Sequence, residues 1–279
     1  MFSKHHLNIT GVVLKKHLSP DYLKRGKSSS WGPPDAFILP WKRKIGLGFD
    51  PQHFTRGNAP NTTESLDRSL KYVEKLENFV LGKLEQASKQ RGIARKVSIL
   101  IALGGMGRIF HAYQDFYSHT NWVMLTAPKS KVWNGSTLQP NLDKPELLKN
   151  CLPNHWLVHV ILPVLKIVKK VDYKHYLDPT INLKHSEMNL DGKKSRASKG
   201  VKKSHGVNGF KLAKSNAIRH SKREWEKIMT ELEERIGEKK ARKFEKFLKT
   251  DRTGIISNVL SRLLTDCELK RAHIFDLSV

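Results

Sequence analysis

Three side chains that can bind a metal ion, His111, Asp115 and His119, recur every four residues in one short segment. On an α-helix each step of four residues advances by about 40°, so the three stay on one face. Two imidazoles and a carboxylate suit borderline metals such as zinc. A polar surface stripe and hydrogen-bonded core histidines are the alternatives. Because burying unpaired polar groups is costly, apolar neighbours favour a metal. Aromatic residues flank the stripe: Phe110, Phe116, Tyr117 and Trp122.

A second pair, His220 and Glu224, has the same spacing of four residues. Apolar residues of helical periodicity surround it, so both side chains again share one helix face. Ligands from one helix turn, completed by ligands from a distant helix, commonly close a metal site in a helical bundle. A surface ion pair is the alternative for this pair alone.

The composition limits the ligands and suggests the partners. The two cysteines, Cys151 and Cys267, lie far apart in the sequence and are expected to be buried small hydrophobic residues. A metal would therefore be held by His, Asp and Glu. The formal net charge of +25 attracts polyanions such as nucleic acid, anionic lipid headgroups or phosphorylated substrates. A basic run at 193–203 is interpreted as a solvated loop or as a polyanion contact.

The elements that must position these residues are helices. Apolar periodicity predicts helices at 5–18, 62–91, 94–121, 152–170, 212–236, 238–250 and 254–270. The segments 19–61 and 172–210 are expected to be loops. Glycines within 94–121, Gly104 and Gly105 among them, would permit close approach of neighbouring helices. The sequence predicts an all-α multi-helix bundle, with one metal-binding domain at 1–236 and a helical extension at 237–279 packed on it.

Five motifs occur in an order that resembles the zinc-dependent phospholipases C. They span residues 6–230 and begin at His6 (His-Leu-Asn-Ile-Thr), Gly48 (Gly-Phe-Asp), His111, Lys184 (Lys-His-Ser-Glu-Met-Asn-Leu-Asp) and His220. The central motif, which runs to Trp122, is most similar to the branch named for the heterokaryon-incompatibility C protein. Single-strand-specific zinc nucleases share the same helical fold. The resemblance therefore implies a phospholipase C-type bundle with long loops.

The resemblance also implies a cluster of two or three zinc ions. Asp50, His111 and Asp115 would serve the central metals, and Asp50 is the candidate bridging ligand or catalytic base. His185, His220 and Glu224 would hold another ion, His6 would belong to the third, and His119 matches a histidine of the central motif. Gly48 stands where relatives often carry histidine, and His53 could compensate. Secreted relatives use the amine and carbonyl of the mature N-terminal residue as metal ligands. In this sequence five residues precede His6.

The function implied by the resemblance is hydrolysis of a phosphodiester, with hydroxide from zinc-bound water attacking phosphorus. The substrate would be a phospholipid or a nucleic acid. Loop tryptophans, Trp31, Trp41 and Trp133, could contact either substrate or pack in the core. A zinc-dependent nuclease and a non-catalytic basic protein that binds nucleic acid or an anionic membrane surface are the alternatives. No signal peptide or membrane-spanning segment is recognised, so a soluble, intracellular protein is expected.

Overall fold

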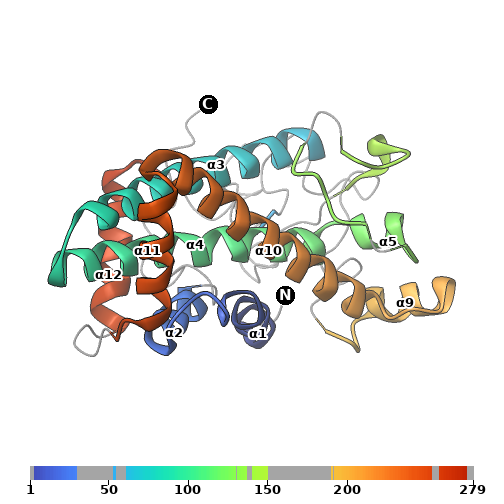
Figure 1. The fold of residues 1–279 in the computed structure, drawn as a ribbon. Helices are drawn as coiled ribbons and strands as arrows, with labels where there is room; N and C mark the ends of the chain where they lie inside the picture. Colours follow the sequence, from blue (N-terminus) through green and yellow to red (C-terminus); the bar gives the residue numbers. More distant parts are fainter. Residues whose placement is uncertain are drawn as a thin grey trace, which may run out of the picture. The chain divides into compact units, whose positions relative to one another are not determined.

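The computed structural model describes residues 3–29, 53–54, 61–129, 131–136, 140–149, 190, 192–252 and 258–274. These residues are mostly helical and contain no strand, which confirms the predicted all-α fold (Figure 1). The helices are α1 (Ser3–Leu14), α2 (Pro20–Ser29), α3 (Thr62–Lys89), α4 (Gly92–His119), α5 (Trp122–Thr126), the 3-10 helix η2 (Pro145–Leu147), α9 (Arg196–His205), α10 (Gly209–Ile236), α11 (Glu238–Thr250) and α12 (Asn258–Arg271). The helix predicted at 152–170 lies outside the described residues.

The chain divides into two compact units. The first unit comprises Met1 with residues 34–70 and 115–216, and the second comprises residues 2–33, 71–114 and 217–279. Three 28-residue helices, α3, α4 and α10, contribute residues to both units. The domain boundary expected between residues 236 and 237 stays a prediction.

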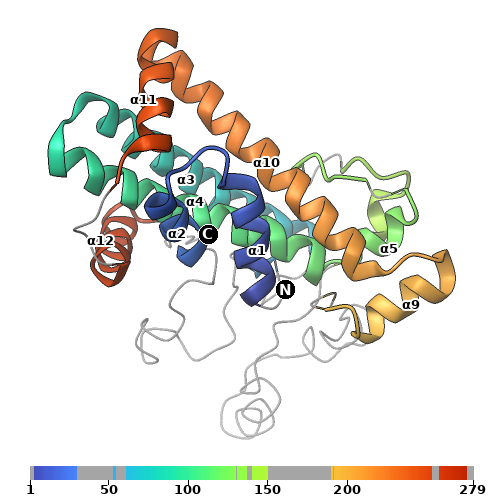
Figure 2. The same cartoon turned by 60° about the horizontal axis from the view of Figure 1, so that its bottom comes forward.

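Helix α2 lies where the sequence predicts a loop, so that part of the prediction for 19–61 is wrong. Pro20 occupies the first helical position, where a missing N–H and a fixed φ are favourable. The helix then buries Tyr22 and Arg25 completely within the second unit. It packs against α1, as Figure 2 shows, and against α12. The tertiary packing of Tyr22 and Arg25 therefore stabilises this helix. Both side chains end in polar groups, so hydrophobic periodicity does not reveal them.

Close helix packing in the second unit depends on glycine, as the sequence predicts. A Cβ atom on Gly105 of α4 would lie 2.7 Å from Val80 Cγ2 of α3. A Cβ atom on Gly104 would lie 2.5 Å from Thr265 Oγ1 of α12 and 2.6 Å from Arg25 Nη2 of α2. Side chains at these positions would push α4 away from three neighbouring helices.

The core of the first unit is aromatic. Phe116 stacks on Trp133, with ring centroids 4.0 Å apart, and Phe54 meets both rings edge-on. The Tyr117 hydroxyl accepts a hydrogen bond from the Trp133 backbone N–H at 3.1 Å. Trp133 is therefore a buried core residue, and its predicted alternative role in touching substrate is wrong. Trp31 and Trp41 lie outside the described residues.

Helix α9 also lies where the sequence predicts a loop, within 172–210. Its buried face consists of small residues, Ala197, Ser198 and Val201, too few for a hydrophobic periodicity to reveal. The ends carry clear signals instead. The Ser195 side chain caps the N-terminus by accepting from Ser198 N–H, and Gly206 ends the helix with φ 72°.

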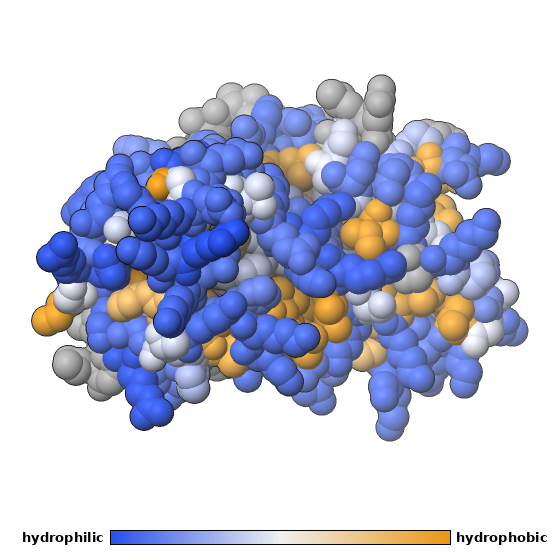
Figure 3. All heavy atoms as spheres, in the orientation of Figure 1, coloured by the Kyte–Doolittle hydropathy of each residue, from blue (hydrophilic) through white to orange (hydrophobic). Residues whose placement is uncertain are grey.

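The surface is mainly polar on the face drawn in Figure 3, with hydrophobic residues in small separate patches. Cys267 on α12 is exposed, so the expectation that it is buried is wrong. Within the described ranges, no helix has the length and apolar composition needed to cross a bilayer.

Candidate metal centre

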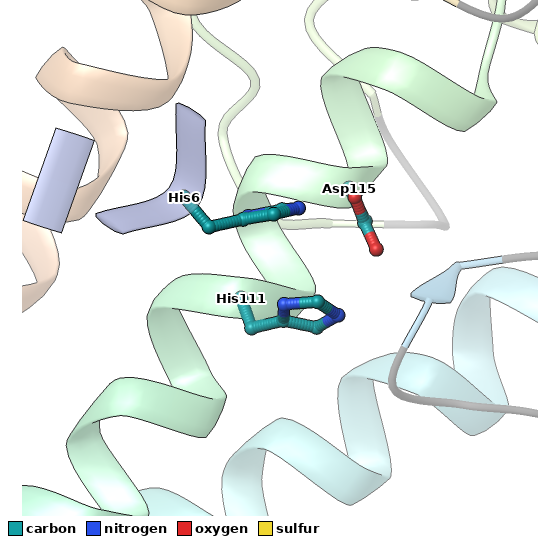
Figure 4. Close-up of side chains that lie close together, drawn as sticks. All are labelled: His6, His111 and Asp115. Atoms are coloured by element: carbon teal, nitrogen blue, oxygen red, sulfur yellow. The ribbon is translucent and has the colours of Figure 1, made fainter. Parts of the chain in front are cut away.

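Three buried side chains lie close enough together to hold one metal ion. His6 on α1 and His111 on α4 have ring centroids 4.4 Å apart, and Asp115 follows His111 by one turn of the same helix. One ligand atom from each residue lies within 4.8 Å of the other two. Figure 4 shows the two rings and the carboxylate facing one another. The exposed fractions are 1% for His6, 5% for His111 and 2% for Asp115.

Two helices position these ligands. Every residue of α4 from Ser98 onward is buried, so the i, i+4 ligands of its last two turns lie inside the protein. On α1, His6 precedes buried Ile9 and Thr10 by three and four residues and shares their face. The packing that buries Ile9 and Thr10 therefore also buries the His6 imidazole.

Gln114 fixes the orientation of the His6 ring. Its Oε1 lies 2.7 Å from His6 Nδ1, and its Nε2 donates to Thr10 Oγ1 at 3.2 Å and to Ser221 Oγ at 3.5 Å. Because the Gln114 amide donates through Nε2, Oε1 is the acceptor and Nδ1 carries the proton. Nε2 is then the His6 nitrogen that would bind a metal, as in histidine ligands held by an outer acceptor.

We expect the Gln114→Leu variant to bind zinc about 10- to 100-fold more weakly than wild type, because His6 loses the acceptor that fixes its tautomer. Competition with a chromophoric chelator measures this affinity. The Gln114→Glu variant retains an acceptor oxygen and should lose less. Equal zinc affinities for folded Gln114→Leu and wild type would contradict this role.

Asp115, which lies in the part of α4 that belongs to the first unit, also contacts His53. His53 Nδ1 lies 2.6 Å from Asp115 Oδ2, and the Asp115 side chain is almost entirely buried. His119 Nδ1 donates to the backbone oxygen of His53 at 3.0 Å and lies 3.9 Å from Asp115 Oδ2. Because a carboxylate has two oxygens, Asp115 can bind His53 and also offer a metal ligand. His53, which the sequence suggests only as a replacement, is therefore a direct partner of this centre.

The donors fit a divalent ion of borderline character. The group found among the described residues offers two imidazole nitrogens and one carboxylate oxygen, a donor set that zinc sites use. All three side chains are buried, which suits a site enclosed by the protein. The residues that would hold the metal are His6, His111 and Asp115, while Gln114 and His53 would orient them.

The predicted second pair forms a separate buried cluster in the second unit. His220 Nε2 lies 3.4 Å from Glu224 Oε1 and 2.9 Å from Arg223 Nη2. Glu77 of α3 accepts a hydrogen bond from Lys227 at 2.6 Å. Glu224 Oε2 is buried and lacks a hydrogen-bond partner among the described residues. The alternative of an exposed surface pair is thus wrong, yet this cluster is not part of the three-residue group.

Burial controls the protonation of this second cluster. Burial, followed by the charges of Arg223 and Lys227, lowers the pKa of His220 well below its usual value. Burial also raises the pKa of Glu77 to about 7; the Lys227 hydrogen bond opposes this shift and the charge of Glu224 adds to it. At neutral pH the His220 ring is therefore neutral.

A pH dependence of stability follows from His220. Its pKa is lower in the folded than in the unfolded state, so the unfolded state binds more protons below about pH 6.5. We expect its contribution to the free energy of unfolding to be complete above that pH and to fall by at most about 1.4 kcal/mol per pH unit below it. Urea unfolding in EDTA, between about pH 7 and pH 5, should show a smaller decrease for His220→Gln than for wild type. Parallel decreases would contradict this assignment.

The structure thus brings together part of the predicted site. His6, which the resemblance places at a third metal, lies instead with His111 and Asp115. His119 lies beside Asp115 without joining the group, and His220 with Glu224 forms the separate cluster. Asp50 and His185, predicted as the bridging or catalytic carboxylate and as a ligand, lie outside the described residues.

Comparison of the chain with protein-family models, with curated proteins and with solved structures finds no match. The resemblance to zinc-dependent phospholipases C rests on the motifs quoted above.

Proposed function

We propose that this protein is a divalent-metal-dependent hydrolase of phosphodiesters, with zinc as the metal. The observation that carries the proposal is the buried convergence of His6, His111 and Asp115, with Gln114 orienting the first ligand. When bound, the ion would supply Lewis-acid chemistry and would lower the pKa of a coordinated water toward about 7. Among the described residues the group offers three protein ligands, the number that catalytic zinc sites typically use.

The chain's own residues would prepare this site for a phosphate group. His53 restrains the Asp115 carboxylate through a 2.6 Å contact, so that ligand need not reorient on substrate binding. The net charge of +25 would draw an anionic substrate toward the protein and raise its local concentration. Asp50 remains the proposed bridging ligand or catalytic base.

Phospholipid is the first substrate class to test, because the motif order resembles phospholipases C. Nucleic acid is the second, and one observation favours it: eight Lys and Arg residues and no acidic residue occur between Gly192 and Asn216. Phosphatidylcholine vesicles and single-stranded DNA therefore make a direct comparison of the two classes.

The test is hydrolysis of both substrates by protein loaded with zinc, by protein stripped with EDTA, and by stripped protein supplied again with zinc. The proposal predicts that one substrate is cleaved, that the chelator abolishes cleavage, and that zinc restores it. Zinc-loaded protein that cleaves neither substrate would favour the alternative of a non-catalytic basic protein that binds nucleic acid or an anionic membrane surface.

A further inference from the structure

Among the described residues of the first unit, α9 and its flanks form a strongly cationic surface. We define the basic ridge as the exposed cationic residues of this segment: Lys193, Lys194, Arg196, Lys199, Lys202, Lys203 and Lys211. From Gly192 to Arg223 the sequence contains no Asp or Glu. None of the ridge residues forms an ion pair with any acidic residue in the described part of the chain.

Other helices of this protein carry acidic residues that form ion pairs with exposed cations. Arg68 pairs with Glu64 on α3, and Arg242 pairs with Glu238 on α11, both at i, i+4 spacing. On α9 the corresponding i, i+3 and i, i+4 neighbours are like charges, for example Lys199 with Lys202 and Lys203. Such like-charge pairs destabilise a helix. A bound polyanion would relieve this repulsion.

The ridge is held rigidly on the first unit. Ser198 Oγ donates to Asn208 Oδ1 at 2.9 Å and accepts from Phe210 N–H at 3.0 Å. Val201 packs against Gly209 so closely that a Cβ atom there would lie 3.1 Å from Val201 Cβ. The cations are therefore presented from a fixed helix, which reduces the entropy lost when a partner binds.

The side chains of the ridge select the kind of polyanion. The one aromatic residue among Phe, Tyr and Trp between Gly192 and Asn216 is Phe210, which is buried, so the ridge offers no platform for stacking bases. The apolar residues of α9, Ala197 and Val201, are buried, so the helix has no anchor to insert into a bilayer. What remains is a row of Lys and Arg that suits regularly spaced phosphates.

We propose that the basic ridge binds double-helical nucleic acid through its phosphate backbone, without reading sequence. This interaction goes beyond the proposed hydrolase function and does not require the metal centre. Its affinity should fall steeply with salt, because each neutralised phosphate contributes a slope of about −0.9 in log K against log salt.

The experiment uses the full chain in EDTA, which suppresses any metal-dependent cleavage, and a fluorescent DNA duplex of about 20 base pairs of arbitrary sequence. The ridge variant is K199Q/K202Q/K203Q, and the matched control is K239Q/K243Q/K246Q on α11, whose lysines are also exposed. Glutamine keeps high helix propensity, so circular dichroism and thermal unfolding should match wild type.

We expect the ridge variant to lose about 2 to 3 units of salt slope and at least about tenfold in affinity near 0.1 M salt. The control should stay close to wild type. Equal losses in both variants would overturn the proposal, since net charge would then be responsible. The absence of duplex binding by wild type would also overturn it. So would ridge-dependent binding of vesicles containing about one-third phosphatidylserine without binding of the duplex, because the partner would then be a membrane.

Discussion

The Asp115→Asn variant is expected to bind zinc at least about 100-fold more weakly than wild type and to lose metal-dependent hydrolysis with it. Loss of an outer-shell partner alone reduces metal affinity by about 10- to 100-fold, so loss of an anionic ligand should reach the top of that range. Asparagine keeps the size of the side chain but removes the charge that offsets the cation. It also weakens the contact with His53.

The matched control for this variant is Asp143→Asn, which makes the same chemical change at an exposed position of the first unit. Equilibrium dialysis against zinc, followed by metal analysis of the folded protein, compares the variants directly. His111→Gln should behave like Asp115→Asn, since it removes the ligand one turn earlier. A folded Asp115→Asn protein with wild-type zinc affinity would remove Asp115 from the centre.

The Gly104→Ala variant is expected to lose about 1 to 3 kcal/mol of unfolding free energy. The added Cβ would lie 2.5 Å from Thr265 Oγ1 and 2.6 Å from Arg25 Nη2. Arg25 cannot retreat easily, because its Nη2 donates to Thr265 Oγ1 at 2.7 Å and its Nε donates to the Leu100 oxygen at 3.3 Å. The substitution therefore disturbs a buried polar network as well as the packing of α4 against α12.

Gly82→Ala on α3 serves as the control for that substitution. Apart from the backbone of its own helix, no atom of the described residues lies within 4 Å of the position that its Cβ would occupy, and the residue is exposed. Alanine there should leave stability unchanged or increase it by about 0.5–1 kcal/mol, because it lowers the entropy of the unfolded chain. Urea unfolding midpoints measure both variants. Equal midpoints for Gly104→Ala and wild type would show that the α4–α12 contact is loose.

Periodicity predicts α3, α10 and α11 well, because each of them buries one apolar face. The amphipathic pattern of 62–91 corresponds to α3, and those of 212–236 and 238–250 correspond to α10 and α11. Two of the helices that the sequence does not predict, α2 and α9, bury polar or small residues such as Arg25 and Ser198. Their caps, Pro20 at one helix start and Gly206 at the other helix end, are the signals that could have identified them.

Spacing on one helix predicts which ligands share a face, but not which helices meet. The spacing of four predicts that His111 and Asp115 share one helix face. The aromatic residues around them indicate a buried segment, and α4 is buried there. The position of His6 beside His111 depends on how α1 packs, which a local pattern does not contain. The contacts made by Gln114 and His53 are likewise long-range, 108 and 62 residues apart in sequence.

The most direct test of the account is a zinc-edge anomalous diffraction map from crystals of the zinc-loaded protein. The account predicts an anomalous peak bound by His6 Nε2, a His111 ring nitrogen and an Asp115 carboxylate oxygen, at about 2.0–2.2 Å from each ligand atom. A map from folded, zinc-soaked protein with no peak among these three side chains would contradict it.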